Sequence, residues 1–335
     1  MKILQTLHWT QFAGTEKVCV DLCNEFASNG HEVFLLTNDK IKPYINEKVK
    51  FIELDFEKNR YNPIFLYSVA KLIKHIKPNV IHCHNTKELE VMCNARTFMK
   101  AYIPIVATRH NAEMKKKYKK ADLAIGVSKE TMNFLNARQN ILIENGTPFK
   151  KPKKISLNNK FNIIGIGRLA KVKGWDLLIK ALAQVKFDFE LILLGEGTEK
   201  YNLQRLCNEL NIQDKVYFKG FVTNVNDYIF SSDMQVIASI EEGLSIALIE
   251  GVFYSKLLIA SDIANHKEIL GDELVFDRDE KILAKKLTEI YENYDKFVHI
   301  FAKTKETKEQ YSIKTMAQKY LKAYESVIKN EPLGT

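Results

Sequence analysis

The segment at residues 239–251, with the sequence SIEEGLSIALIEG, constrains this chain more than any other stretch. It places Glu242 just before a glycine and Glu250 inside an apolar run typical of a helix. A glycine turn at the start of a helix leaves backbone N–H groups exposed, and such groups bind phosphate. The segment therefore predicts a strand, a turn and a helix that together bind an anionic ligand.

A second glycine-rich segment, residues 165–174 with the sequence GIGRLAKVKG, lies upstream and supplies cations. Gly165 and Gly167 follow a strand-like run, where glycine permits a tight turn and a close approach of the backbone. Arg168 could neutralise a diphosphate through its planar fork, and Lys173 could do so as a point charge. Taken alone, the segment is also compatible with a surface helix that opens after Lys173. Acids for sugar hydroxyls and cations for a diphosphate together predict a nucleotide-sugar site.

The bulk composition excludes several classes of protein. A chain of 335 residues is long for one core and comfortable for two. Its 46% hydrophobic and 27% charged residues are typical of a soluble globular protein. No apolar run reaches 18 residues, so no membrane span is expected, and the N-terminus reads as a first strand rather than a signal peptide. The five scattered cysteines, without a CxxC pair, fit a reducing cytoplasm.

The positive charge is concentrated in the first half. Residues 1–155 hold 26 Lys and Arg against 15 Asp and Glu, whereas the remainder holds 24 against 26. The excess gathers at Lys115, Lys116, Lys117, Lys119 and Lys120, and again at residues 150–154. Such a face could attract an anionic membrane surface, at about 1 kcal/mol per cation. A solvated lysine-rich surface is the alternative, and no recognition motif or aromatic-basic platform favours nucleic acid.

Strand-like and helix-like patterns alternate along the chain, which predicts parallel sheets with helical crossovers. The pattern breaks at residues 145–154, where proline, glycine and lysine cluster as in a linker. We therefore expect an N-terminal domain at 1–150, joined by a C-terminal helix at about 312–330, and a donor-binding domain at 151–311. The expected strands are 2–7, 32–37, 49–54, 80–82, 105–107, 123–127 and 141–143 in the first domain, and 162–166, 190–194, 216–218, 234–238 and 257–260 in the second.

Further motifs follow strands, where ligands of open parallel sheets bind. Gly14 follows the first strand and begins a helix that could bind an anion, although Thr15 is also a plausible helix cap. His82 and His84 end the fourth strand; polar lining of a cleft is favoured over a metal site, because no third ligand is nearby. His110 follows another strand and could hydrogen-bond a substrate hydroxyl or phosphate. Gly195 reads as a turn that lies near the nucleotide.

Together these residues resemble a retaining glycosyltransferase of the two-Rossmann (GT-B) type, specifically family 4. The resemblance covers nearly the whole chain and is strongest from Gly165 to Glu268. The family's acidic and glycine pattern aligns without gaps onto residues 242–251, and Ile259, Ala260 and Ser261 match a later motif. The resemblance implies an α/β fold in which two Rossmann-like domains face each other across a cleft, with the C-terminal helix packed on the first domain.

The resemblance also implies roles. Glu250 would bind the ribose hydroxyls, Glu242 the donor sugar, and Arg168 with Lys173 the diphosphate. His110 would contact the sugar near the reacting carbon. Four further positions would let the donor approach or offer it backbone N–H groups: Gly14, Gly243, Leu244 and Ser245. Gly167 and Gly195 complete the expected donor site. Where the family has glycine or proline, this chain has Ala13, Ser245, Ala247, Ser255 and Leu257. These departures alter loop shape and donor choice but leave every charged group in place.

We therefore expect a cytoplasmic hexosyltransferase that needs no metal and no cofactor. It would move a sugar from a nucleotide diphosphate-sugar, with a UDP-sugar favoured, to a hydroxyl of a glycan or lipid-linked glycan in surface polysaccharide or glycoconjugate assembly. The resemblance implies that the anomeric configuration is retained. No convincing nucleophile is visible on the N-terminal side, so a front-face mechanism is expected. Peripheral contact with the inner membrane face is a further hypothesis. The alternatives are a nucleotide-sugar epimerase of the same fold and a non-catalytic nucleotide-sugar-binding protein.

Overall fold

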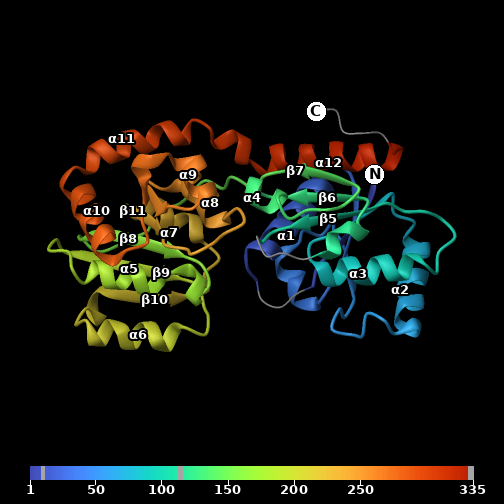
Figure 1. Ribbon diagram of the computed structural model, residues 1–335, viewed down its shortest axis with the longest axis horizontal. Helices are drawn as coiled ribbons and strands as arrows, with labels where there is room; N and C mark the ends of the chain where they lie inside the picture. The colour runs from blue at the N-terminus through green and yellow to red at the C-terminus, as the bar shows by residue number, and fades with distance from the viewer. Residues whose placement is uncertain (9–11, 112–115, 331–335) are drawn as a thin grey trace. The chain divides into compact units, whose positions relative to one another are not determined.

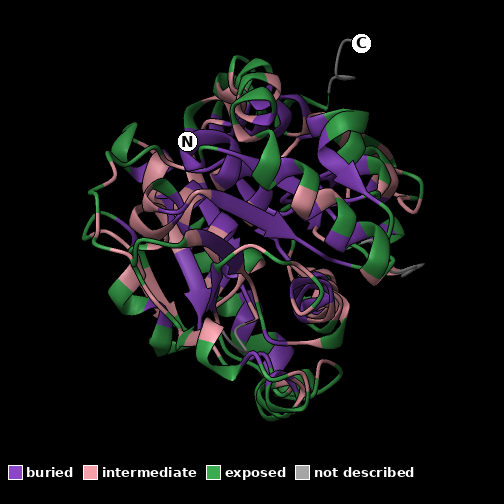
Figure 2. Cartoon of the chain, turned by 90° about the vertical axis from the view of Figure 1, so that its left-hand side faces the viewer, coloured by how far each residue is buried: buried purple, intermediate pink, exposed green. Residues whose placement is uncertain are grey.

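The computed structural model describes residues 1–8, 12–111 and 116–330 of the chain (Figure 1). The chain divides into two compact units. The first contains Met1–Pro148 and Tyr311–Thr335, and the second contains Phe149–Gln310. Each unit has one parallel β-sheet covered by helices, so the predicted α/β class is confirmed. Figure 2 shows buried residues along the central strands and exposed residues on the outer sides of the helices.

The sheet of the first unit has, among the described residues, seven parallel strands in the order β3-β2-β1-β4-β5-β6-β7. Their bounds are β1 (Lys2–Thr6), β2 (Glu32–Thr37), β3 (Lys50–Glu53), β4 (Val80–Cys83), β5 (Ile105–Arg109), β6 (Leu123–Gly126) and β7 (Gln139–Leu142). The helices are α1 (Gly14–Ser28), α2 (Pro63–Ile76), α3 (Thr86–Arg96), α4 (Lys129–Met132) and α12 (Ile313–Lys329). The strand order reverses between β1 and β4, and open parallel sheets bind ligands beyond the carboxyl ends of the strands at such a reversal.

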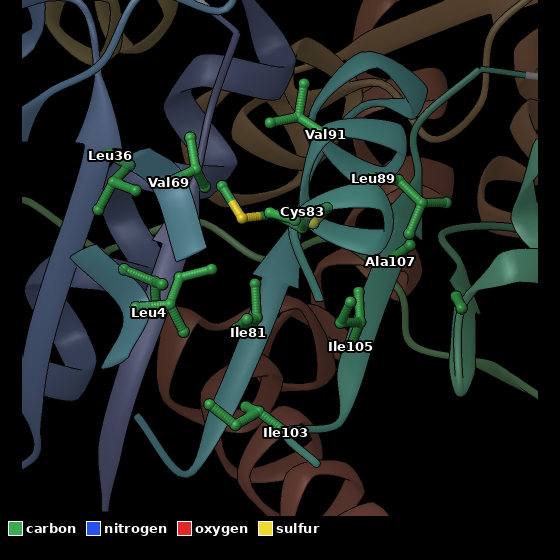
Figure 3. Packing of buried hydrophobic residues seen from close by; sticks show 14 of the residues in the cluster. Leu4, Leu36, Val69, Ile81, Cys83, Leu89, Val91, Ile103, Ile105 and Ala107 are labelled. Carbon is green, nitrogen blue, oxygen red and sulfur yellow. The ribbon is translucent and has the colours of Figure 1, made fainter. Parts of the chain in front are cut away.

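One face of this sheet is mainly apolar. Because side chains alternate along a strand, Ile81 and Cys83 of β4 share a face with Ile105 and Ala107 of β5. Figure 3 shows these side chains gathered with Leu89 of α3 in one buried cluster. Burial of such side chains contributes about 1.5–3 kcal/mol each, which holds α2 and α3 against the sheet.

The opposite face carries polar side chains. Gln5 of β1 pairs in register with His82 of β4, and Thr108 of β5 lies on the same side. All three are fully buried. Helix α12 supplies Tyr320 and Tyr324 to this face, where their hydroxyls bind the strand side chains.

Helix α12 joins the first unit through a close chain contact. The Ile313 N–H donates to the Thr147 carbonyl at 3.1 Å, and Thr147 bridges Ser312 in parallel. A Cβ on Gly146 would lie 2.6 Å from the Ser312 carbonyl oxygen, so only glycine allows this approach. The final helix therefore packs on the strands formed by the first half of the chain.

The second unit has a six-stranded parallel sheet in the order β10-β9-β8-β11-β12-β13. Its strands are β8 (Phe161–Ile166), β9 (Phe189–Leu194), β10 (Val216–Gly220), β11 (Met234–Ile237), β12 (Leu258–Ser261) and β13 (Val275–Phe276). Its helices are α5 (Trp175–Leu182), α6 (Lys200–Glu209), α7 (Val225–Ser231), α8 (Ile246–Tyr254), α9 (Ala264–Leu270), α10 (Glu280–Glu292) and α11 (Tyr294–Lys305). The strand order reverses between β8 and β11.

Every strand predicted from the sequence is present, with bounds that differ by two residues at most. The sequence missed β13, because a strand of two residues carries no alternation. The alternative that Thr15 caps the first helix is wrong. Helix α1 begins at Gly14, its N-cap position is Ala13, and the Ala13 N–H is satisfied by the Glu16 carboxylate at 3.1 Å.

Candidate active site

The strand reversal of the second unit brings the two predicted motifs together. Strands β8 and β11 are neighbours in the sheet, although some 70 residues separate them in the chain. Arg168 and Lys173 follow β8, and Glu242 follows β11. Parallel strands end at the same edge, so the cations and the carboxylate share one edge of the sheet.

The two loops are tied to each other by their backbones. The Ile240 N–H donates to the Val172 carbonyl at 2.8 Å. Gly174 has a φ of 64°, and a Cβ added there would collide with the Ala238 carbonyl oxygen. A residue with any side chain would therefore push the loop after β8 away from the end of β11.

Glu242 forms an ion pair with Lys173, through one carboxylate oxygen and the ammonium group. The same oxygen accepts a hydrogen bond from the Ser239 hydroxyl at 2.7 Å. The two charged side chains are only 17% and 13% exposed, so they neutralise each other in a shielded place. A bound diphosphate would compete for Lys173 and free the carboxylate to accept hydrogen bonds from hydroxyls.

Arg168 is exposed, and no carboxylate in the described part of the chain forms an ion pair with it. Its backbone is fixed, because the Trp175 indole N–H donates to the Arg168 carbonyl at 2.9 Å. The free guanidinium beside the neutralised Lys173–Glu242 pair leaves a local positive charge at this edge of the sheet.

Gly167 and Gly195 lie against each other beyond β8 and β9. Gly195 has a φ of 135°, and a Cβ there would collide with the Gly167 carbonyl oxygen. The Gly195 N–H donates to the Gly220 carbonyl at 2.8 Å. Gly195 thus has a structural reason to be glycine, which agrees with its interpretation as a turn.

Helix α8 carries the second predicted acid. Glu250 lies half-buried in the middle of the helix, and Ser245 occupies the N-cap position with Leu244 and Gly243 buried before it. A Cβ on the next residue, Gly251, would lie 2.7 Å from the Gln235 side-chain oxygen. Glycine therefore lets α8 pack closely on β11.

Sequence reasoning missed Asn265 and His266 at the start of α9. The Asn265 amide donates to the carbonyls of Glu242, at 3.0 Å, and Gly243, and so holds the turn that presents the acid. His266 Nδ1 lies 3.0 Å from the Ser261 carbonyl and must donate to it, which leaves Nε2 as a buried lone pair without a partner among the described residues. Burial lowers the pKa of His266. Only the segment's nearness to the family motif at Ser261 could have pointed to them.

The first unit places its predicted residues at the β1 and β4 ends. Gly14 is the exposed first residue of α1. His82 and His84 are 0% and 1% exposed, so they form part of the core and do not line a surface. Both nitrogens of each ring are hydrogen-bonded within the chain. The prediction that His82 and His84 line a cleft is therefore wrong. They form a buried hydrogen-bond network, because α12 covers the face of the sheet that carries them.

His110 follows β5 and stacks on His84, with ring centroids 5.5 Å apart. Its Nε2 lies 3.2 Å from His84 Nδ1, whereas its Nδ1 is buried and has no partner in the part of the chain that the structure describes. Burial lowers the pKa of His110 to about 4, so the ring is neutral near pH 7.

Glu88 is a second residue that sequence reasoning missed. It lies in the first turn of α3, directly beyond β4, and is fully buried. One oxygen accepts the His8 backbone N–H, and the other has no partner among the described residues. Burial raises the pKa of Glu88 to about 7, which lets this carboxyl hold or release a proton near neutral pH.

Two further properties of the described residues concern metal ions and the membrane. No group of three or more His, Cys, Asp or Glu side chains is placed to hold a metal ion. None of the described helices combines the length and the apolar character needed to cross a bilayer.

Two Rossmann-type sheets, each with polar groups at the strand reversal, define a GT-B fold. Known families agree with this architecture. The family model "Glycosyl transferases group 1" matches residues 147–312, and "Glycosyltransferase Family 4" matches residues 12–146. The chain therefore belongs to the family 4 glycosyltransferases of the GT-B type.

Two relatives and one solved structure illustrate the match. The chain is 25% identical over 296 residues to an uncharacterized glycosyltransferase of Haemophilus influenzae, covering 76% of this chain and 80% of that one. It is 39% identical over 120 residues, or 36% of its length, to the Campylobacter jejuni "N-acetylgalactosamine-N,N'-diacetylbacillosaminyl-diphospho-undecaprenol 4-alpha-N-acetylgalactosaminyltransferase". The aligned part spans only about a third of the first curated relatives, at 33%, 32% and 29% of their lengths. Anabaena HepE, solved in complex with UDP and glucose, has the same fold with a TM-score of 0.83 at 17% identity, covering 97% of this chain and 100% of that one.

The contact of Gly174 with the Ala238 carbonyl predicts a large loss of stability on substitution. Gly174→Ala should lower the free energy of unfolding by about 3 kcal/mol or more, because left-handed strain adds to a collision with backbone. Gly220→Ala is the control in the same unit: its φ is 72° and a Cβ would meet only the Glu196 carboxylate at 3.5 Å. Urea unfolding should show a loss of about 1–2 kcal/mol there. Equal losses would contradict the assigned contact.

Because Glu88 is buried, we predict that replacing its carboxyl group raises the free energy of unfolding by an amount that depends on pH. The pKa of Glu88 is about 7 in the folded protein, against 4.5 for the free group. The free energy of unfolding of the wild type is therefore highest below pH 4.5 and falls as the pH rises to about 7, because the buried carboxyl must then lose its proton. Glu88→Gln does not titrate. It should gain about 2–3 kcal/mol relative to wild type between pH 5 and pH 8 in urea unfolding. Exposed Glu53→Gln is the control, and a Glu88→Gln difference that does not change with pH would exclude this role for burial.

Proposed function

We propose that the protein is a retaining glycosyltransferase that moves a sugar from a nucleotide diphosphate-sugar to a hydroxyl of a glycan or lipid-linked glycan. The observation that carries the proposal is the meeting of Arg168, Lys173 and Glu242 at the strand reversal of the second unit. Two cations suit a diphosphate, and a hydrogen-bonded carboxylate suits the hydroxyls of a sugar.

The relatives support particular substrates. The Campylobacter protein is named for transfer to a sugar carried on diphospho-undecaprenol, and the Anabaena structure holds UDP and glucose. We infer that this chain uses a UDP-sugar and a glycan or lipid-linked acceptor, in the assembly of surface polysaccharide or another glycoconjugate.

The proposed mechanism assigns each charged group one task. Arg168 and Lys173 bind the diphosphate and stabilise the charge that grows on it as the sugar bond breaks. Glu242 binds donor-sugar hydroxyls, Glu250 binds the ribose, and the N–H groups at the start of α8 face the phosphates. The family resemblance adds His110, which contacts the donor sugar, and Gly14, which gives the donor room.

The acceptor hydroxyl attacks the reacting carbon of the sugar from the same face on which the diphosphate leaves. Its proton passes to the leaving diphosphate. The configuration at the reacting carbon is then retained without a protein nucleophile. We propose that the two cations carry the electrostatic role that a metal has in other transferases, so the reaction proceeds without one.

The test is turnover of UDP-sugars by wild type and by two lysine variants. Lys173→Ala should reduce kcat/KM at least 100-fold, because transition-state charge loses a close cation. Lys171→Ala is the control, since this exposed lysine lies two residues away in the same loop. Wild type should keep its rate in chelator, and NMR of the product should show a retained anomeric configuration.

Other outcomes favour other functions. Equal rates for the two lysine variants would overturn the assignment of Lys173. Interconversion of sugar nucleotides without an acceptor would favour an epimerase. Binding of UDP-sugars without turnover or interconversion would favour a non-catalytic protein.

We also propose that the first unit contacts an anionic membrane surface. Of the predicted lysines, Lys119 and Lys120 are exposed, Lys117 pairs with Glu90 at 2.9 Å, and Lys115 lies outside the described residues. Lysines attract anionic headgroups, and their segment packs on α3 through the Cys93 thiol and the Lys120 carbonyl.

A set of exposed apolar side chains supports this surface. Ile64 is 80% exposed and Tyr67 is 58% exposed on α2, and Tyr67 contacts Phe98, just beyond α3, edge to face. Helices α2 and α3 lie side by side in Figure 1, and α3 also contacts the lysine segment. Exposed Lys71 and Lys74 lie on α2 as well. Aromatic and aliphatic groups beside lysines suit the interface of an anionic bilayer.

Sedimentation with liposomes tests this proposal. The protein should bind phosphatidylglycerol vesicles at low salt and lose most binding at high salt or on phosphatidylcholine. Ile64→Asp with Tyr67→Asp should weaken binding about 10-fold or more by loss of apolar contact and charge repulsion. Tyr201→Asp, at a tyrosine 72% exposed on α6, is the control. Equal binding by both variants would exclude this face.

A further inference from the structure

A buried chain of hydrogen bonds connects helix α12 to His110 across strands β1 and β4. Its centre is Gln5, which donates through Nε2 to the Tyr324 hydroxyl at 3.2 Å. The Gln5 oxygen lies 2.9 Å from His84 Nε2, and His84 Nδ1 lies 3.2 Å from His110 Nε2. Gln5, Tyr324 and His84 are at most 1% exposed, so water does not compete for these bonds.

The chemistry of Gln5 sets the direction of the chain toward His110. An amide oxygen can only accept, so the proton on His84 must be at Nε2. Burial lowers the pKa of His84 well below 6.5, so the ring is neutral and its Nδ1 is a bare acceptor. His110 must then donate through Nε2. The His110 ring is neutral as well, which leaves its Nδ1 as a lone pair.

A second branch of the hydrogen-bond network runs from Gln5 through Tyr324, and its donors and acceptors are consistent with the first branch. Tyr324 accepts from Gln5 and so directs its own hydrogen to His82 Nδ1 at 2.7 Å. His82 is neutral, because burial lowers its pKa to about 3, and its proton must therefore be on Nε2. That nitrogen donates to the Thr108 hydroxyl at 2.7 Å, and Thr108 meets the Tyr320 hydroxyl at 3.0 Å. A reversed Gln5 amide would reverse the bonds along both branches.

We infer that Gln5, His84 and Tyr324 are positioning residues that hold His110 in the Nε2–H form, so that its Nδ1 lone pair accepts a hydrogen bond from a hydroxyl of the bound sugar. This inference rests on the proposed function, in which His110 contacts the donor. Nδ1 is a buried nitrogen without a partner among the described residues, and a buried acceptor of this kind selects a ligand that donates. A hydroxyl fits it, whereas a carbonyl or phosphate oxygen does not.

The first experiment reads the proton positions directly. The full-length protein, with ¹⁵N-labelled histidine, is studied without ligand by proton–nitrogen NMR, and signals are assigned with single His→Gln variants. We expect a proton on Nε2 and a bare Nδ1 for both His84 and His110. A proton on His110 Nδ1 would overturn the inference. This measurement needs no enzymatic activity. It therefore determines the direction of the hydrogen bonds between Gln5 and His110 even if the protein shows no glycosyl transfer.

Two matched variants on α12 test the positioning role. Tyr324→Phe removes the acceptor that orients Gln5, so His110 should populate both neutral forms and kcat/KM for the UDP-sugar should fall about 10-fold. Tyr320→Phe also loses a buried hydroxyl one turn away, but from the far end of the other branch. It should keep the Nε2–H form and a kcat/KM within about 3-fold of wild type. Equal effects of the two variants on the His110 signals would overturn the role of Tyr324.

The ligand half of the inference is tested by titration with UDP and with UDP-glucose. UDP-glucose should shift the His110 Nδ1 signal toward that of a hydrogen-bonded acceptor, and UDP alone should leave it unchanged. Bound UDP-glucose that leaves the Nδ1 signal unchanged would overturn the assignment of a sugar hydroxyl to this atom. Failure of UDP-glucose to bind would contradict the proposed donor, while the proton positions measured without ligand would still stand.

Discussion

The contact between Lys173 and Glu242 is the interaction on which the candidate donor site depends. It forms because the strand order reverses between β8 and β11, which brings two loops distant in the chain to one edge of the sheet. A backbone hydrogen bond from Ile240 to Val172 and the close approach at Gly174 hold those loops together. The carboxylate and the ammonium neutralise each other in a shielded place. The backbone of the candidate site is thus held in position by contacts within the second unit.

The first unit has the same type of sheet but buries polar side chains on one of its faces. The sheet face that packs against α2 and α3 is mainly apolar, whereas the face under α12 has Gln5, His82 and Thr108 buried in the interior. Polar groups buried at this density cost free energy unless each is hydrogen-bonded, and the hydroxyls of Tyr320 and Tyr324 provide the missing partners. The last helix of the chain therefore satisfies the strands of the first half. The lone pair of His110 remains as the open end of this network.

Much of the architecture could be read from the residues themselves. Alternating apolar runs predicted the strands, and the acidic segment at 242–250 with the cations at 168 and 173 predicted a common site; the structure places Arg168, Lys173 and Glu242 at one sheet edge. Other features lacked any local signal. The support of the Glu242 turn by Asn265 is a contact between a side chain and a distant backbone. Glu88 looks like an ordinary helix residue until burial raises its pKa to about 7. His82 and His84 were expected to line a cleft, because a sequence does not show which face of a strand a later helix covers.

The sequence by itself determined the α/β class, the strand positions, the family and the types of charged group available to a ligand, because these follow from residue periodicity and from short motifs. The tertiary structure alone decided which groups meet: the pairing of Lys173 with Glu242, the burial of Glu88, and the chain from Tyr324 through Gln5 and His84 to His110. The physical reason is that hydrogen bonds and burial depend on distances between residues that are far apart in the chain, and only folding sets those distances.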